Sequence, residues 1–221
     1  MTDSDERTRE LAAESVAGGE ATGWFEKLYV AAEAGEATVP WDRTTPHVLL
    51  GQWTELHGVE GAGRRAIVVG CGFGADAEHL AGLGFETVAF DIAPTAVAAA
   101  RRRAPESRVD YVEADLLNPP AEWRHAFDLV FESLTVQSLP PPMHVPAIDA
   151  VGQLVAPGGT LLVIATARDA REGPVDGPPW PLTRGELESF ATAGLEPVSV
   201  EHIADESDPS IGRWRATFRR V

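Results

Sequence analysis

The chain has 221 residues, 44% hydrophobic and 24% charged, which is the composition of an ordinary globular protein with room for one sizeable domain. Its formal net charge of −16 repels nucleic-acid phosphates, and no stretch approaches the roughly 20 apolar residues of a membrane span. We therefore expect neither a nucleic-acid partner nor a membrane. Cys71 is the sole cysteine, which excludes an internal disulfide and fits a reducing cytoplasm. The six histidines lack the spacing of metal ligands, so we expect no metal site.

The first 60 residues predict an N-terminal helical extension that forms a lid. We expect a charged, loosely docked helix over residues 3–17, a helix with an apolar stripe over 22–34, and a third helix over 47–57. The third helix should bury Val48, Leu49, Trp53 and Leu56. Trp41 lies in a loop with two prolines, residues 38–46, and a tryptophan in such a loop often meets or covers a ligand.

An alternation of strands and helices begins at residue 65 and continues through the rest of the chain. The expected strands are 66–70, 87–91, 108–113, 127–132 and 160–166, with helices at 75–83, 95–103 and 145–155. A helix over 183–193 and two strands, 196–203 and 211–221, close the chain. Repeated strand–helix units predict an α/β fold, in which a seven-stranded, mostly parallel sheet with an antiparallel edge strand is covered by helices on both faces. We assign this second unit to residues 61–221.

Three glycines at alternate positions follow the first predicted strand, in the segment Gly70-Cys71-Gly72-Phe73-Gly74. Such a turn brings the backbone close to a ligand and directs free N–H groups toward it. Asp91 ends the second strand about 20 residues later, the spacing at which a carboxylate can hold a ribose diol. The glycine spacing alone also fits a dinucleotide, so two cofactors remain open at this point.

Asp115 at the end of the third strand and a Pro157-Gly158-Gly159 turn before the fifth strand narrow this choice. With them, residues 65–164 resemble the class I S-adenosylmethionine-dependent methyltransferases, which have a Rossmann-like three-layer sandwich. The resemblance implies that the methionine part of S-adenosylmethionine lies against the glycine turn and that the remaining contacts follow the strand ends. The cofactor-binding residues that it implies in this second unit are Gly70, Cys71, Gly72, Gly74, Asp91, Ile92, Asp115, Leu116 and Glu132.

One departure from the family pattern concerns the amino group of the cofactor. Many members carry an acidic residue two positions before the first glycine, where this chain has Val68. One contact to this amino group is therefore either missing or supplied from elsewhere, and Glu132, at the end of the fourth strand, is the candidate. The resemblance also assigns both ribose hydroxyls to Asp91 and the adenine to Asp115 with Leu116.

A narrower resemblance links Trp24-Phe25 and Pro40-Trp41-Asp42 to the N-terminal segment of thiopurine, halide and thiol methyltransferases. It implies that Trp24 and Trp41 cover the cofactor, and that a small molecule such as a thiol, halide or phenol accepts the methyl group. A general base is needed only if that acceptor must lose a proton. Glu132 and Asp42 are the candidates, while His144 at a helix start is expected to be structural.

Two rival functions are weighed against methyl transfer. An NAD(P)-dependent oxidoreductase would fit the glycine turn, but the tyrosine–lysine pair of the short-chain type is excluded because the single lysine, Lys27, precedes the nucleotide fold. A non-catalytic, cofactor-binding protein of the same fold is the other alternative. The sequence does not give the oligomeric state or the identity of the acceptor.

Overall fold

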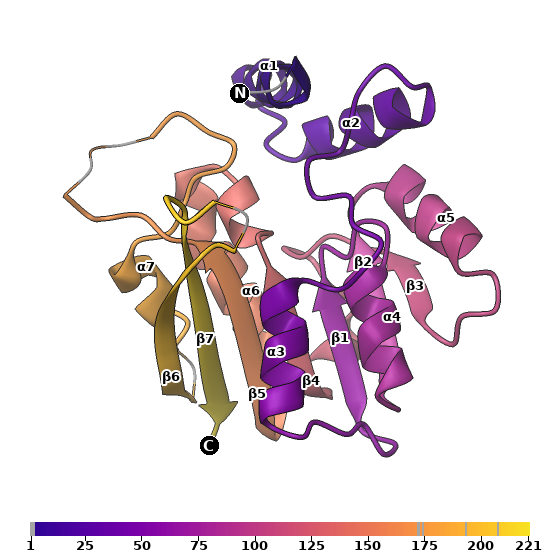
Figure 1. The fold of residues 1–221 in the computed structure, drawn as a ribbon, viewed down its shortest axis with the longest axis vertical. Helices are drawn as coiled ribbons and strands as arrows, with labels where there is room; N and C mark the ends of the chain where they lie inside the picture. The colour runs from indigo at the N-terminus through magenta and orange to yellow at the C-terminus, as the bar shows by residue number, and fades with distance from the viewer. Residues whose placement is uncertain (1–2, 172, 174, 193, 207) are drawn as a thin grey trace.

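Seven strands form one sheet in the order β3-β2-β1-β4-β5-β7-β6 (Figure 1). The computed structural model describes residues 3–171, 173, 175–192, 194–206 and 208–221. The strands are β1 (Arg65–Val69), β2 (Glu86–Asp91), β3 (Asp110–Glu113), β4 (Phe127–Ser133), β5 (Val155–Thr166), β6 (Leu195–Ala204) and β7 (Gly212–Arg220). The first five strands run parallel, and β7 is antiparallel to both of its neighbours, β5 and β6. This confirms the predicted mostly parallel sheet, with the antiparallel strand one place inside the edge.

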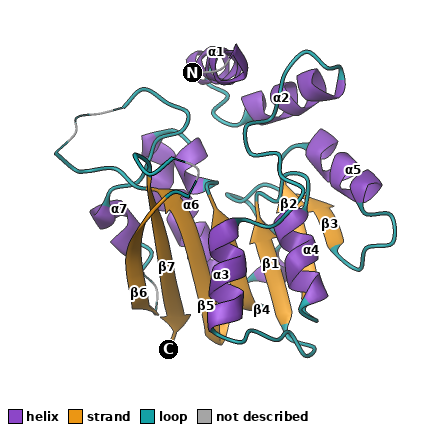
Figure 2. Cartoon of the chain, viewed as in Figure 1, coloured by secondary structure: helices purple, strands orange, loops and turns teal. Residues whose placement is uncertain are grey.

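Helices cover both faces of the sheet, which completes the three-layer sandwich (Figure 2). These helices are α3 (Val48–Leu56), α4 (Ala75–Gly82), α5 (Pro94–Arg103), α6 (His144–Leu154) and α7 (Arg184–Glu188). Because side chains alternate along a strand, β1 sends Ala66 and Val68 into one apolar cluster, and Ile67 and Val69 into the other. The first cluster contains side chains of α3, α4 and α5, and the second contains those of α6 and α7.

Two helices, α1 (Asp3–Ala17) and α2 (Gly23–Glu33), lie above the carboxyl ends of the parallel strands (Figure 1). The prediction of a loosely docked first helix is wrong, because α1 buries Leu11 and Ala12 in a separate apolar cluster. That cluster also contains Trp24 of α2 and Ala96 of α5. The lid is therefore packed on α5 rather than suspended over the sheet. The division of the chain at residues 60 and 61 stays a prediction.

Two helices differ from their predicted form. In α3 the buried face is Leu49, Leu50 and Trp53, while Val48 and Leu56, at the two ends of the helix, are exposed. The helix predicted over 183–193 ends at Glu188, because Phe190 turns into the core beside Phe218, and residue 193 lies outside the described residues. Within the described ranges, none of the helices has both the length and the apolar character needed to cross a membrane.

The register of the sheet brings three strand ends to one place. Val69 pairs with Phe90 on one side and with Glu132 on the other. The residues that follow, Gly70, Asp91 and Ser133, therefore lie together at the carboxyl edge. In open α/β sheets, ligands bind at this edge, where the strand order reverses direction.

Candidate active site

The glycine turn between β1 and α4 is shaped by its neighbours. Gly70 and Gly74 have positive φ angles of 60° and 90°, a conformation that disfavours other residues. A Cβ atom on Gly70 would lie 2.4 Å from the Thr135 hydroxyl, and one on Gly74 would lie 2.2 Å from the Tyr111 hydroxyl. The turn thus needs glycine for both its conformation and its packing.

A hollow opens above this turn, and we call it the first hollow. Most of the residues predicted to bind the cofactor line it. These are Trp41, Gly70, Cys71, Gly72, Gly74, Asp91, Ile92, Asp115 and Leu116. Phe25, Tyr29, Arg43 and Leu139 also line it, and sequence reasoning assigned none of these to the site.

Asp91 is buried and ties the glycine turn to the end of β2. Its Oδ2 accepts the Gly72 N–H at 2.9 Å, and its Oδ1 accepts the Ala93 N–H at 3.0 Å. Burial raises the pKa of Asp91 to about 6, and these backbone N–H groups limit the rise. Each carboxylate oxygen accepts more than one hydrogen bond, so Asp91 can still receive ligand hydroxyls.

Two other residues at the edge of the first hollow have clear local roles. The exposed Asp115 accepts the Leu117 N–H at 2.8 Å and fixes the turn after β3, while Leu116 is buried beside it. Cys71 is buried too, and burial raises the pKa of its thiol well above the ordinary value. A thiol that stays protonated is a small apolar filler rather than a nucleophile.

Aromatic side chains from α2 and from the lid loop (residues 38–46) close one side of the first hollow. Trp41 packs edge-on against Phe25 and Tyr29, with ring centroids 6.5 and 6.2 Å apart. Its Nε1–H donates to the Tyr29 hydroxyl at 2.7 Å. Trp24 stacks on Phe25 at 4.0 Å but does not line this hollow, contrary to its predicted contact with the cofactor. Phe25, one position along the same helix, has the place expected for Trp24.

The lid loop and α3 are tied to the first turn of α4 by Asp76, which is buried. Its Oδ1 accepts a hydrogen bond from the His47 N–H at 2.6 Å, and its Oδ2 accepts one from Nη2 of Arg43 at 3.0 Å. Burial raises the pKa of Asp76, and Arg43 and the His47 N–H partly offset that rise. The helix that starts at the glycine turn therefore also holds the loop that carries Trp41.

Neither candidate base lines the first hollow. Asp42 points to α5, where both of its oxygens accept from Arg103 at 2.6 and 2.9 Å. Glu132 is 1% exposed, and its Oε1 accepts the N–H groups of Thr135 and Val136 at 2.8 and 3.0 Å. Its Oε2 is buried with no hydrogen-bond partner in the described part of the chain. The structure therefore does not favour either residue for proton transfer, or Glu132 for the amino group of a cofactor.

His144 has the structural place expected of it. It is buried at the start of α6, with Nε2 2.9 Å from the Leu139 carbonyl oxygen. In the described residues, no group of three or more histidine, cysteine, aspartate or glutamate side chains could hold a metal ion.

Comparisons with known proteins agree with this geometry. Residues 66–159 match the family model of a methyltransferase domain. The probable thiol methyltransferase 2 of Arabidopsis thaliana is 27% identical over 205 residues, which cover 88% of this chain and 85% of that protein. The N-methyltransferase NodS from Bradyrhizobium japonicum WM9, solved with S-adenosyl-L-homocysteine, has the same fold, with a TM-score of 0.65, 24% identity, and coverage of 87% of this chain and 98% of NodS. These likenesses support the resemblance to the class I S-adenosylmethionine-dependent methyltransferases that the sequence motifs indicate.

A third protein to which the chain is similar is the ubiquinone biosynthesis O-methyltransferase of Xanthomonas campestris pv. campestris (strain B100). It is 37% identical over 158 residues, which cover 70% of this chain. The match covers 62% of the Xanthomonas protein, which is less than two thirds of its length. The names of these relatives point to different acceptors, so an acceptor for this chain has to be argued from its own residues.

The first hollow fits the cofactor of the family. Its floor is a glycine turn, and a Cβ on Gly72 would lie 3.2 Å from the Tyr29 hydroxyl and 3.5 Å from the Trp41 ring. Its wall contains a buried carboxylate, Asp91, which can accept hydroxyl groups. Apolar side chains, including Phe25 and Leu116, line the remainder. Such a mixture of apolar walls and a few converging polar groups is typical of a small-molecule site.

Proposed function

We propose that this chain transfers the methyl group of S-adenosylmethionine to a small-molecule acceptor. The observation that carries the proposal is one hollow in which the glycine turn, Asp91 and Asp115 meet under aromatic side chains of the lid. Asp91 would hold the ribose hydroxyls, Asp115 and Leu116 the adenine, and the glycine turn the methionine part. Bound there, the cofactor supplies a methyl group on a cationic sulfur.

The residues around the hollow would act mainly by orienting the reactants and excluding water. Methyl transfer needs the acceptor atom in line behind the methyl group. Holding the reactants in this geometry lowers a large part of the activation barrier of such reactions. Phe25 and Trp41 close the hollow from the lid side, while Leu134, Ser138 and Leu139 line it from the segment after β4.

The surroundings of the reacting centre favour an acceptor that ionises without help. The carboxylates that line the first hollow are Asp76, Asp91 and Asp115, and each already accepts hydrogen bonds from the protein. This supports a thiol, a halide or a phenol, in agreement with the name of the Arabidopsis relative. With a thiol or a phenol as the acceptor, kcat/KM should rise with pH along the pKa of the acceptor rather than along that of a protein group.

Calorimetry and a turnover assay test the proposal. S-Adenosylhomocysteine should bind and NADH should not, which separates methyl transfer from the oxidoreductase alternative. Asp91→Ala should abolish binding of S-adenosylhomocysteine, while Asp149→Ala, an exposed aspartate on α6, should leave it unchanged. A panel of thiols, halides and phenols then tests turnover. Binding without methylation of any acceptor would support the non-catalytic alternative, and full affinity of Asp91→Ala would refute the ribose assignment.

A further inference from the structure

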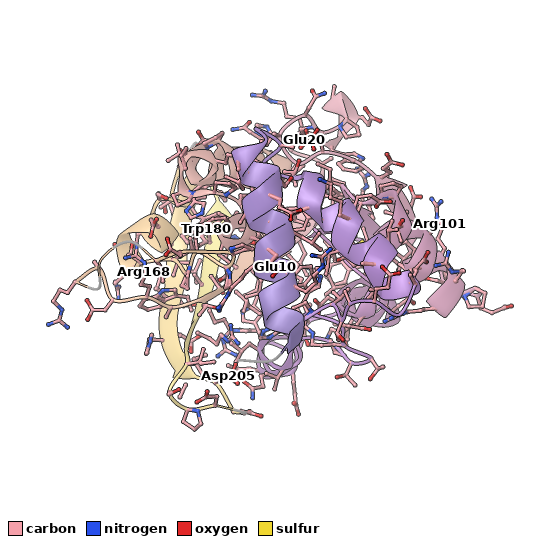
Figure 3. All side chains as sticks on the ribbon, turned by 90° about the horizontal axis from the view of Figure 1, so that it is seen from above. Glu10, Glu20, Arg101, Arg168, Trp180 and Asp205 are labelled. Carbon is pink, nitrogen blue, oxygen red and sulfur yellow. The ribbon has the colours of Figure 1, made fainter. Side chains whose placement is uncertain are left out.

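A second hollow lies beside the first on the far side of Trp41. It is lined by residues of α1, the lid loop, the segment after β4 and the turn from β6 to β7. Figure 3 views the molecule from above and labels Glu10 of α1 and Asp205 of that turn. Four side chains line both hollows: Trp41, Arg43, Leu134 and Ser138. A molecule in the second hollow can therefore reach the first at this junction.

The second hollow gathers positive charge in a strongly acidic chain. The sequence has 34 aspartates and glutamates against 18 lysines and arginines. Nevertheless Arg9, Arg43 and Arg213, from three separate segments, line this one hollow, against two acidic residues, Asp205 and Glu206. The lining thus has one more positive than negative side chain in a chain with a net charge of −16, so this hollow suits a negatively charged group better than the chain as a whole does.

Arg43 is only partly used by the protein. Its Nη2 donates to Asp76 at 3.0 Å, and its Nε is buried without an acceptor among the described residues. A guanidinium has five N–H donors and suits a carboxylate well, so one ion pair leaves it most of its capacity. Its side chain is 32% exposed, at the junction of the two hollows.

Arg213 approaches the same place from β7. Its Nε donates to Asp205 at 2.8 Å, and its guanidinium also donates to the Thr166 hydroxyl. The electrostatic effect of both arginines reaches His47, which lines the second hollow: burial is the larger cause that lowers the pKa of His47 to about 3, and Arg43 and Arg213 lower it further. The imidazole is therefore neutral, and the positive potential at this point comes from the two arginines.

The remaining lining of the second hollow is mixed, and its apolar part includes flat rings. Trp24 and Trp41 line it from the lid, and Pro178 and Pro179 line it from the segment before α7. Indole and proline rings of this kind are suited to packing against an aromatic or other planar apolar body. Arginines that can bind an anionic group and flat rings that can pack against an aromatic group thus line the same hollow.

We propose that the methyl acceptor is an apolar, ring-bearing molecule with a carboxylate, and that Arg43, with Arg213, binds this carboxylate in the second hollow. This inference rests on the proposed methyl transfer, because it makes the second hollow the place of the acceptor. The ring lies between the indole and proline rings, and the nucleophilic atom reaches the junction at Trp41 and Ser138.

Binding of matched product analogues to the protein saturated with S-adenosylhomocysteine tests this inference. 4-(Methylthio)benzoate and the neutral 4-(methylthio)benzamide differ in the charged group alone. We expect the benzoate to bind at least tenfold more tightly, and Arg43→Met to remove that preference. Arg103→Met is the matched control, because Arg103 anchors the same loop through Asp42 and lines neither hollow.

A second variant separates loss of the anion site from loosening of the lid loop. Asp76→Asn removes the ion pair of Arg43 but leaves the guanidinium in place, so the tenfold preference should persist. Equal affinity of wild type for the two analogues, or an unchanged preference in Arg43→Met, would overturn the inference. A preserved preference for the benzoate in a protein that methylates neither 4-mercaptobenzoate nor any acceptor of the panel would refute the proposed function but support the carboxylate site.

Discussion

Glu132 provides a test of the structure, because a buried carboxylate whose Oε2 has no hydrogen-bond partner among the described residues lowers the free energy of unfolding when it is ionised. Burial raises its pKa from 4.5 to about 7, and the two N–H groups that it accepts limit the rise. The protonated form is therefore favoured in the folded protein. Stability from this group is fully present below the pKa of the unfolded chain and is lost as the pH rises through about 7. Between about pH 5 and about pH 8.5 the loss amounts to about 2.5 kcal/mol.

The substitution Glu132→Gln should remove this pH dependence. The glutamine Oε1 can still accept from Thr135 and Val136, and its amide stays neutral at every pH. We expect little change in the free energy of unfolding at about pH 5, and a gain of about 2 to 3 kcal/mol over wild type at about pH 8.5. Urea unfolding at the two pH values measures the difference, and comparing the two cancels any effect that does not depend on pH.

The control is Glu122→Gln, which makes the same chemical change at an exposed position. A stability difference between wild type and Glu132→Gln that is equal at both pH values would refute the reasoning. So would a loss of stability in the variant at high pH. Because Glu132 does not line the first hollow, we also expect Glu132→Gln to bind S-adenosylhomocysteine as wild type does. Loss of that affinity would restore the contact with the cofactor amino group predicted from the sequence.

Three further substitutions test the glycine turn and the lid. Asp91→Asn should weaken S-adenosylhomocysteine binding at least tenfold in calorimetry, and wild-type affinity should fall below the pKa of about 6, where this carboxylate is protonated. Affinity that does not vary with pH would contradict this. Tyr29→Phe removes the acceptor of Trp41, which should cost about 1 kcal/mol and change tryptophan fluorescence; an unchanged spectrum would contradict the contact. Gly74→Ala should lower the unfolding temperature by clashing with Tyr111, whereas Gly82→Ala, with open space around it, should not; equal effects would refute the packing argument.

The sequence predicted the parts of the site that depend on spacing along one strand and its turn. Gly70, Asp91 and Leu116 each follow a strand of the parallel sheet, and parallel strands bring their carboxyl ends to one edge whatever surrounds them. The positions of these residues therefore follow once the strands are recognised. For the same reason the order of strands and helices in the second unit could be predicted almost throughout.

The lid could not be predicted as well, because it depends on how helices are rotated on their neighbours. Adjacent helical residues point about 100° apart. The narrower resemblance predicted that Trp24 covers the cofactor, but tertiary packing places Phe25 at the first hollow and buries Trp24 in the apolar cluster of the lid. Arg43 and Tyr29 were missed for a related reason, since each meets the glycine turn only after the lid has folded over the sheet.

Asp42 shows how such packing bears on the chemistry. The hydrogen bonds and charge of Arg103 lower the pKa of Asp42, in spite of its partial burial. A carboxylate held in its ionised form by an arginine is a weaker base than a free one, and this one points toward α5. The residue is thus better suited to fix the lid loop than to remove a proton. Glu132 does not line the first hollow either. In the proposed methyl transfer, the acceptor must therefore lose its proton without a protein base. Thiols have a pKa of about 8.5 and phenols one of about 10, so a larger fraction of a thiol is ionised near neutral pH. This difference favours sulfur as the atom that receives the methyl group in the proposed reaction.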